Sequence, residues 1–303
     1  ALGGVRADGT EKPEIDVMRR FAAFAKAASP SLQEPDRPDV AIVTSEAAQF
    51  SHMWNTQMEA QRNAVRALCY GGRVTGYLVG ESQIARMGHP KLVVLPSPQA
   101  FGDKAWQQLL EYVHSGGTLL VTGAVNRDEH WHVRNRLAAA GLQGSVEPLT
   151  FRTATLVANG ESIPMSFNQA AQSMLESVRF ADGATLESKP YGQGHIFWSS
   201  YPVELVENPD AAAHLYQFVL KQANLAPMYD SISSLPPGVL VYPTVLRDAV
   251  LYIFESEDAA DTPINLRDKA TGATLHFTLE SRHAALVLLS KKDGSVLASY
   301  GYQ

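Results

Sequence analysis

The densest group of titratable side chains is the run Asp128-Glu129-His130-Trp131-His132. Two imidazoles beside two carboxylates could bind a metal ion or carry protons. However, residues two positions apart on a helix point about 200° away from each other, unlike the i, i+4 pair of a zinc helix. The acidic residues suit the start of a helix. We therefore predict no metal site, and interpret His130, Trp131 and His132 as contacts to a substrate or a neighbouring subunit.

A second aromatic and polar group follows the first predicted strand. His52, Trp54 and Asn55 could stack on a sugar and hydrogen-bond to it. Alternatively, Phe50, Met53 and Trp54 pack as a lid or as a contact between subunits. We predict that His52, Trp54 and Asn55 contact a substrate or a neighbouring subunit.

Other catalytic signals are absent from the sequence. No G-x-G-x-x-G follows the first predicted strand, and no G-x-x-x-x-G-K-S/T occurs, so we expect no nucleotide cofactor. The turn at 122–126 has neither serine nor cysteine to act as a nucleophile. Cys69 lies among apolar neighbours at a predicted helix end, where cysteine packs as a small apolar residue. An amidotransferase or hydrolase that uses Cys69 is therefore our last-ranked hypothesis.

Composition excludes several protein classes. The 303 residues carry a formal net charge of −6, with 25 basic and 31 acidic side chains, which argues against nucleic-acid binding. No run of about 18 apolar residues predicts a membrane span. The single cysteine excludes an intrachain disulfide and slightly favours the cytoplasm. The start at Ala1, without methionine or a signal sequence, suggests a truncated beginning.

The elements that position these residues follow from the hydrophobic pattern. Apolar residues at helical spacing predict a helix over 13–28, and three prolines within 29–38 predict a linker. Short apolar runs then alternate with helical stretches, which is typical of parallel strands buried on both faces. The predicted strands are 40–43, 74–79, 91–95 and 118–122, and the predicted helices are 57–68 and 103–114, the latter capped by Asp103. We expect an α/β, flavodoxin-like, doubly wound parallel sheet.

In the rest of this domain the pattern of helices and strands is less regular. A further helix is predicted over 129–140, and strand-like pieces at 146–151 and 153–157 suggest an antiparallel insertion or edge. A late strand is predicted at 194–200. A closing helix over 208–223 has Asn208 as its cap and Pro209 at its first position.

In the last part of the chain, apolar and polar residues alternate as they do in β-strands. The predicted strands are 239–242, 249–255, 264–267, 274–278, 284–289 and 296–300, with a hairpin turn at 292–294. They predict a small antiparallel β-sandwich. The expected domains are therefore 1–38, the end of an upstream barrel and a linker; 39–227, the α/β domain; and 228–303, the sandwich.

Three stretches resemble one family. VRADGTEKP at 5–13, followed by a helix, resembles the last strand-to-helix exit of (β/α)₈ glycoside hydrolases. The α/β domain, with LPSP at 95–98 and YVHSGGTLLVTG at 112–123, resembles the trimerisation domain of family 42 β-galactosidases, a relative of class I glutamine amidotransferases. The final segment resembles their closing β-domain. Catalytic amidotransferases carry a cysteine where this chain has Gly123-Ala124-Val125, which fits a structural version of the fold.

The resemblance implies a role for the chain within a larger enzyme. The family's two catalytic glutamates lie in the barrel upstream of Ala1, so no residue here inherits catalysis. The resemblance implies a homo-oligomer, a trimer, whose loops border the active site where the parent enzyme hydrolyses a galactoside or oligosaccharide with retention. We therefore expect a non-catalytic C-terminal region of a glycoside hydrolase. The alternative is a stand-alone carbohydrate-binding module of amidotransferase-like fold.

Overall fold

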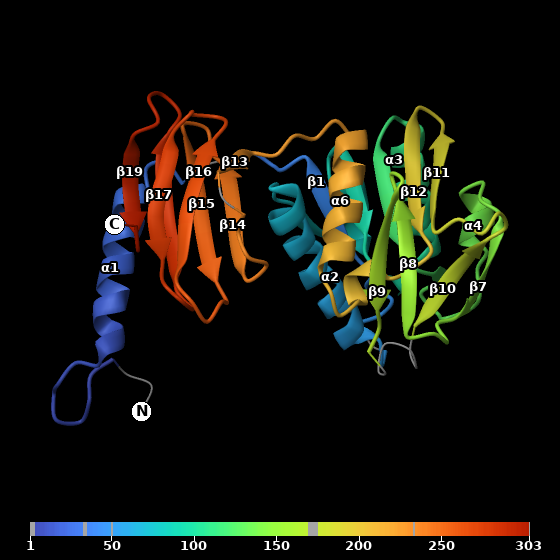
Figure 1. Cartoon of the computed structure of the whole chain (residues 1–303), viewed down its shortest axis with the longest axis horizontal. Coiled ribbons are helices and arrows are strands. Elements are labelled where there is room, and N and C mark those ends of the chain that lie inside the picture. The colour runs from blue at the N-terminus through green and yellow to red at the C-terminus, as the bar shows by residue number, and fades with distance from the viewer. Residues whose placement is uncertain (1–3, 33–34, 50, 169–174, 233, 303) are drawn as a thin grey trace. The chain divides into compact units, whose positions relative to one another are not determined.

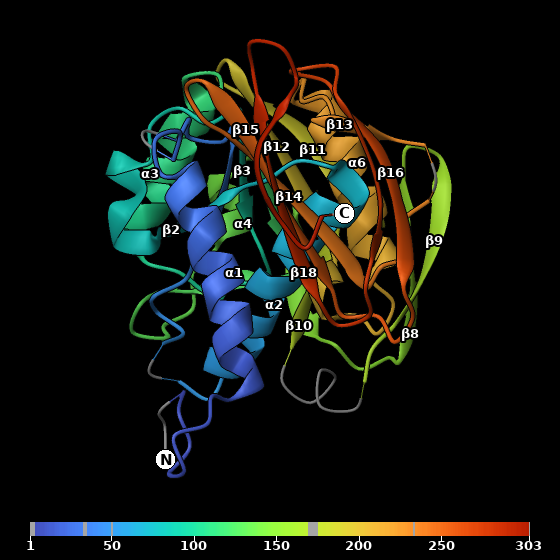
Figure 2. The same cartoon turned by 90° about the vertical axis from the view of Figure 1, so that its left-hand side faces the viewer.

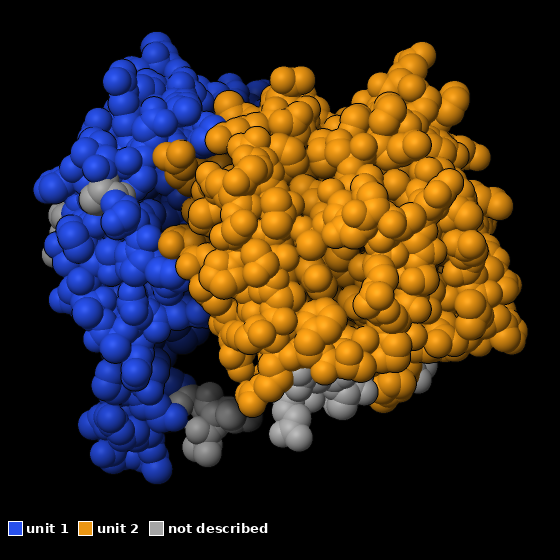
Figure 3. Space-filling model, turned by 45° about the vertical axis from the view of Figure 1, so that its right-hand side comes forward, with its two compact units in different colours: residues 1–36, 227–303 blue, residues 37–226 orange. Residues whose placement is uncertain are grey.

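The computed structural model describes residues 4–32, 35–49, 51–168, 175–232 and 234–302. The chain divides into two compact units, which Figure 3 colours separately. Unit 1 comprises residues 1–36 and 227–303, and unit 2 comprises residues 37–226. Among the described residues no helix has the length and apolar character needed to cross a membrane. The architecture is mixed α/β, with one mainly parallel sheet and several antiparallel sheets.

Unit 2 is built around a six-stranded sheet of order β11-β12-β5-β3-β1-β2 (Figure 1). Its strands are β1 (Val40–Thr44), β2 (Tyr77–Gly80), β3 (Leu92–Leu95), β5 (Thr118–Thr122), β11 (Leu186–Tyr191) and β12 (Gly194–Ser199). All are parallel except β11, which pairs antiparallel with β12. The inner strands β3 and β5 are buried along their whole length, which explains their continuous apolar sequences.

Helices cover both faces of this sheet. They are α2 (Trp54–Ala67), which continues into the π-helical turn η1 (Leu68–Gly72), α3 (Asp103–His114) and α6 (Asp210–Gln222). On one face α3 contributes Trp106, whose ring contacts Trp198 of β12 edge to face, with centroids 5.8 Å apart. On the other face Phe218 of α6 contacts Phe197 of β12. The side chains of β12 therefore alternate between two helical layers, as the strand period requires.

Smaller elements complete unit 2. They are η2 (Glu81–Arg86), β4 (Gln99–Ala100), β6 (Val125–Arg127), α4 (Arg136–Ala139), β7 (Gly144–Pro148), β8 (Thr153–Ala158), β9 (Glu161–Ser166), β10 (Glu176–Phe180) and η3 (Val203–Leu205). β7 pairs antiparallel with β10, and β8 with β9. This confirms the antiparallel character predicted for this stretch.

Two antiparallel sheets share one core in unit 1. Its strands are β13 (Tyr229–Ser231), β14 (Val239–Val245), β15 (Ala249–Ser256), β16 (Thr262–Asp268), β17 (Thr274–Leu279), β18 (Ala284–Ser290) and β19 (Val296–Tyr300). The sheet orders are β13-β16-β17 and β14-β15-β18-β19, and alternate side chains of both sheets form the core. All six predicted strands are confirmed. β13 was missed because three residues are too few to display a period.

The first helix, α1 (Pro13–Ala28), belongs to the same unit and lies beside β19 (Figures 1 and 2). Its bounds match the prediction. Phe24 and Ala28 are buried in a cluster that includes Leu288 of β18. Val17, Met18 and Phe21 remain exposed, at 44%, 64% and 49%, and form an apolar face of which Phe21 contacts Tyr300 on one side.

The helix predicted over 129–140 is wrong for most of its length, since α4 begins only at Arg136. The carboxylate of Asp128 accepts hydrogen bonds from the backbone N–H groups of His130 (2.8 Å) and His132 (2.9 Å). Trp131 lies in the left-handed region with φ of 66°. Such a local turn competes with helix formation, because the aspartate supplies an alternative acceptor for the backbone.

The predicted helix caps also need small corrections. Asp103 is the first residue of α3, and Gly102 occupies the capping position. Asn208 does accept a hydrogen bond from the Asp210 N–H (2.9 Å), but Pro209 is the residue that immediately precedes α6. These shifts by one residue leave the predicted helices in place.

Candidate functional site

The loops at the carboxyl ends of the parallel strands carry an aromatic group of three exposed histidines and one half-buried tryptophan. We define the loop cluster as His52, His130, Trp131 and His132. The rings of His52 and Trp131 lie 5.9 Å apart at 33°, and those of His130 and His132 lie 6.1 Å apart. The structure therefore joins one predicted contact residue after β1 to the predicted group after β6. In a parallel sheet this edge is where ligands and partners are usually bound.

The turn around Asp128 holds Trp131 in this position. Asp128 is only 1% exposed, and besides its two backbone bonds it pairs with Arg134 Nη2 at 2.6 Å. Burial by itself raises the pKa of this carboxyl, but the N–H groups of His132 and His130 and the charge of Arg134 outweigh that effect and lower the pKa below its usual value. Asp128 therefore remains ionised at neutral pH and stabilises the turn.

Acidic residues beside this turn are neutralised by arginines. Oxygens of Asp103, Asp128 and Glu129 lie within 4.8 Å of one another, as ligands of a cation would. However, Asp103 pairs with Arg134 Nε (3.1 Å) and Arg136 Nη2 (2.7 Å). Glu129 accepts the Asp103 N–H (3.1 Å). These partners account for the cluster without a metal ion.

A carboxylate that the sequence analysis missed organises the neighbouring loops. Glu81, directly after β2, accepts hydrogen bonds from the N–H groups of Glu46 (2.9 Å) and Gly102. Burial raises the pKa of Glu81, although the backbone N–H donors act in the opposite direction. Its only sequence signal is its place at the end of a strand. Glu81 thereby connects the loop after β1 to the start of α3.

The remaining predicted contact residues occupy different environments. Trp54 is the first residue of α2 and is half-buried, whereas Asn55 beside it is exposed. Of the proposed lid, Met53 is buried and Phe50 lies outside the described residues. The structure therefore favours His52 over Trp54 as the surface residue of this loop.

A second carboxylate is buried at the carboxyl ends of β3 and β5. Glu204 of η3 accepts hydrogen bonds from the hydroxyls of Ser97 (2.7 Å), Thr122 (2.6 Å) and Tyr216 (2.7 Å). Ser97 has a φ of 46°, a strained backbone state seen at some active sites. Both Ser97 and Glu204 are buried, however, so no substrate reaches them. We interpret this group as a structural connection between β3, β5 and α6.

Cys69 is buried in the turn η1. Burial raises the pKa of its thiol to about 12. The thiolate is the reactive form of cysteine, so this position is unsuited to nucleophilic catalysis. The result agrees with the interpretation of Cys69 as a small apolar residue.

This burial leads to a labelling prediction. At about pH 8, we expect iodoacetamide to alkylate native Cys69 on the order of a thousandfold more slowly than the thiol in the urea-unfolded chain, because a three-unit higher pKa reduces the thiolate fraction by that factor. Mass spectrometry of timed samples measures both rates. Equal rates in the two states would contradict the burial.

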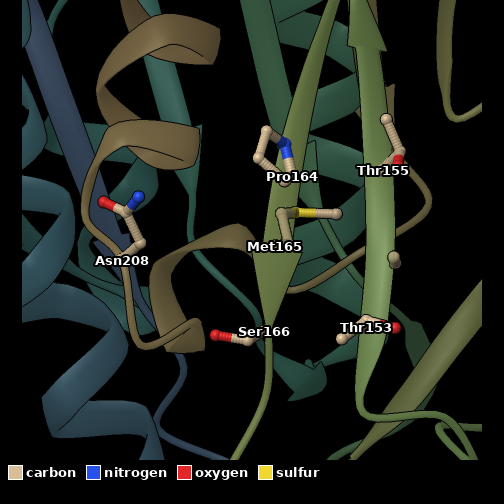
Figure 4. Close-up of a pocket in the computed structure, with 7 residues that line it drawn as sticks. Thr153, Thr155, Pro164, Met165, Ser166 and Asn208 are labelled. Atoms are coloured by element: carbon tan, nitrogen blue, oxygen red, sulfur yellow. The ribbon is translucent and has the colours of Figure 1, made fainter.

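A shallow hollow of about 420 Å³ lies on the β8–β9 hairpin (Figure 4). Thr153 and Thr155 come from β8, and Asn208 approaches from the segment before α6. Ser166 Oγ already donates to Glu207 (2.8 Å), and the amide oxygen of Asn208 accepts the Asp210 N–H. No titratable side chain lines the hollow, so it has no evident chemistry.

Comparisons with known proteins give a fold match. No protein-family model and no curated protein sequence matches this chain. Among solved structures, a catalytic mutant of a GH42 β-galactosidase from G. stearothermophilus aligns with a TM-score of 0.70 at 14% identity. β-Galactosidases from Rahnella sp. R3 and Bacillus circulans sp. alkalophilus align with TM-scores of 0.68 and 0.66, at 14% and 13% identity.

The coverage of these alignments is unequal. Each includes 95% of this chain but only 46%, 46% and 48% of the respective β-galactosidase chains. The chain thus spans about half the length of the structures it matches. At such low identities the likeness concerns the fold, and it fits a GH42-like domain.

Proposed function

We propose that this chain is the non-catalytic C-terminal region of a glycoside hydrolase resembling β-galactosidase, which mediates oligomerisation and shapes a carbohydrate active site. The observation that carries this proposal is the fold match over 95% of this chain and 46% of a GH42 β-galactosidase. We interpret the strand order β2-β1-β3-β5-β12 as the flavodoxin-like, amidotransferase-related sheet of a trimerisation domain. The two antiparallel sheets of unit 1 correspond to its closing β-sandwich.

In this proposal catalysis takes place outside the chain. Asp128, Glu81 and Glu204 are engaged by backbone, arginine or hydroxyl groups, so none serves as one of two facing glycosidase carboxylates. Residues 1–38 form the end of a barrel and a linker, and the exposed face at Val17, Met18 and Phe21 suits coverage by such a barrel. Residues 39–227 and 228–303 form the two following domains.

The loop cluster is the proposed contact between subunits. Its three exposed histidines and the half-buried Trp131 lie at one edge of the sheet, and Asp128 and Glu81 hold the loops that carry them. Aromatic side chains are enriched at protein interfaces because they bury a large area with few rotatable bonds. In a trimer these residues would border an active site of a neighbouring subunit.

Sedimentation equilibrium tests the assembly. We expect a trimer of about 99 kDa, three times the 32.9 kDa of one chain. Trp131→Ala and His52→Ala should each shift the mass towards the monomer, because each removes half of the ring pair. His89→Ala, also exposed in unit 2, is the matched control and should remain trimeric. A wild-type monomer at every concentration would contradict the proposed assembly.

The alternative is a stand-alone carbohydrate-binding module that uses the same aromatic loops. The ring pair of the exposed His52 and the half-buried Trp131 is the observation that favours it. Calorimetry with galactosides distinguishes the two functions. The alternative predicts saccharide binding that Trp131→Ala abolishes, whereas the main proposal predicts that this substitution affects the oligomer.

A further inference from the structure

A groove of about 400 Å³ lies between α1 and β19. It belongs entirely to unit 1, so it is separate from the loop cluster of unit 2 and does not depend on the proposed function. Its volume lies within the range of small-molecule sites. Its lining includes Arg20, Phe24, Ala27, Ser299, Tyr300 and Tyr302.

Aromatic side chains form the apolar part of the groove. Phe24 is buried, whereas Tyr300 and Tyr302 are half-exposed. Tyr300 contacts Phe21 edge to face at 5.9 Å, and Tyr302 contacts Phe277 in the same manner at 5.1 Å. These contacts hold the tyrosine rings in place. A ligand that packs on them therefore loses little binding free energy to the ordering of side chains. Ring faces of this kind suit the C–H surfaces of a pyranose.

The charged residue in the lining of the groove, Arg20, has its partner outside the groove. Arg20 Nε pairs with Asp16 Oδ2 at 3.1 Å, so the guanidinium has a counter-charge on the same helix. This pairing disfavours phosphate or carboxylate ligands, which need uncompensated positive charge. The remaining N–H groups of Arg20 and the hydroxyl of Ser299 are directional partners for sugar hydroxyls.

The backbone beside the groove adds further polar groups. β19 is an edge strand, paired with β18 on one side. Ser299 and Gly301 both line the groove, so N–H and C=O groups on the other side of β19 can face a ligand. Fixed aromatic rings, a compensated arginine and backbone donors and acceptors together match a neutral polyhydroxylated ring. We propose that the groove between α1 and β19 binds a neutral saccharide of one or two rings.

Isothermal titration calorimetry of the full chain with galactose, lactose and maltose tests this site. Ala27→Trp should fill the groove and weaken binding at least about tenfold, because the new indole occupies the ligand volume. Ala22→Trp places the same side chain at an exposed position of α1 that does not line the groove, and should bind as the wild type does. Arg20→Gln should also weaken binding, without enlarging any side chain.

Circular dichroism of each variant confirms that it is folded before titration. The proposal is overturned if none of the three saccharides binds the wild type. It is also overturned if Ala27→Trp and Arg20→Gln bind as tightly as the wild type, or if Trp131→Ala abolishes binding, since the saccharide site would then be the loop cluster. Binding that survives Trp131→Ala and fails in Ala27→Trp supports the groove, whatever the oligomeric state.

Discussion

Replacing Glu204 by alanine should lower the free energy of unfolding by about 3–5 kcal/mol, because it leaves buried hydroxyl groups without their acceptor and opens a cavity. Ser97, Thr122 and Tyr216 all donate to this one carboxylate. They come from the ends of β3 and β5 and from α6, so the loss affects the whole sheet. Urea denaturation followed by tryptophan fluorescence measures the change.

Two companion variants make this result specific. Glu204→Gln keeps the shape and one acceptor oxygen, so it should cost less than Glu204→Ala. Glu207→Gln changes an exposed glutamate three residues away and should alter stability by less than about 0.5 kcal/mol. A Glu204→Ala protein within about 1 kcal/mol of wild type would contradict the role assigned to the buried carboxylate.

The carboxyl group of Glu204 also makes the stability of the protein depend on pH. Burial raises the pKa of Glu204 in the folded state above its value in the unfolded chain, although the three hydroxyl donors act in the opposite direction. Its contribution to stability is therefore complete below the unfolded pKa and is lost as the pH rises through the folded pKa. The stability difference between wild type and Glu204→Gln should shrink as pH rises, which denaturation curves at several pH values test.

Replacing Asp128 by alanine should release the turn that positions Trp131 and abolish the proposed trimer. The substitution removes the acceptor of the His130 and His132 N–H groups and the partner of Arg134. Amide hydrogen exchange at these two histidines should become fast, and sedimentation should show the monomer mass. Without the Asp128 carboxylate, the turn keeps only backbone bonds such as Trp131 N–H to Asp128 C=O (3.0 Å), and these should hold Trp131 less firmly at its left-handed φ of 66°.

Asp128→Asn is the conservative comparison. Its amide oxygen still accepts from the backbone, so the turn should persist in part, while the charge pair with Arg134 is lost. In the wild type the pKa of Asp128 is lowered, so its stabilising effect is present above the unfolded pKa and disappears as pH falls through the folded value. Slow exchange and an intact trimer in Asp128→Ala would contradict this account.

Much of the fold was predictable because it follows from periodicity. The helix 13–28, the strand core of 118–122 and the six late strands have strong local patterns, and the structure confirms them. The helix over 129–140 failed because Asp128, the residue just before it, uses its carboxylate to accept the His130 and His132 N–H groups and so closes a turn instead. Helix propensity does not anticipate this outcome, which depends on the hydrogen bonds of the Asp128 side chain and on its ion pair with Arg134.

The site was only partly visible in the sequence. His52 and Trp131 were both selected from their loops, but their pairing depends on sheet topology that no local pattern contains. Glu81 and Glu204 look like ordinary glutamates, since single carboxylates have no distinctive spacing. Their roles emerge only when distant backbone and hydroxyl groups converge on them.

The central claim is that this chain is the accessory part of a glycoside hydrolase, and reading the gene upstream of the Ala1 codon tests it most directly. The account predicts an in-frame (β/α)₈ barrel with glutamates at two of its strand ends. The fold match over 46% of a β-galactosidase chain leaves room for such a domain. A start codon immediately before Ala1 would contradict the claim and leave a stand-alone binding protein.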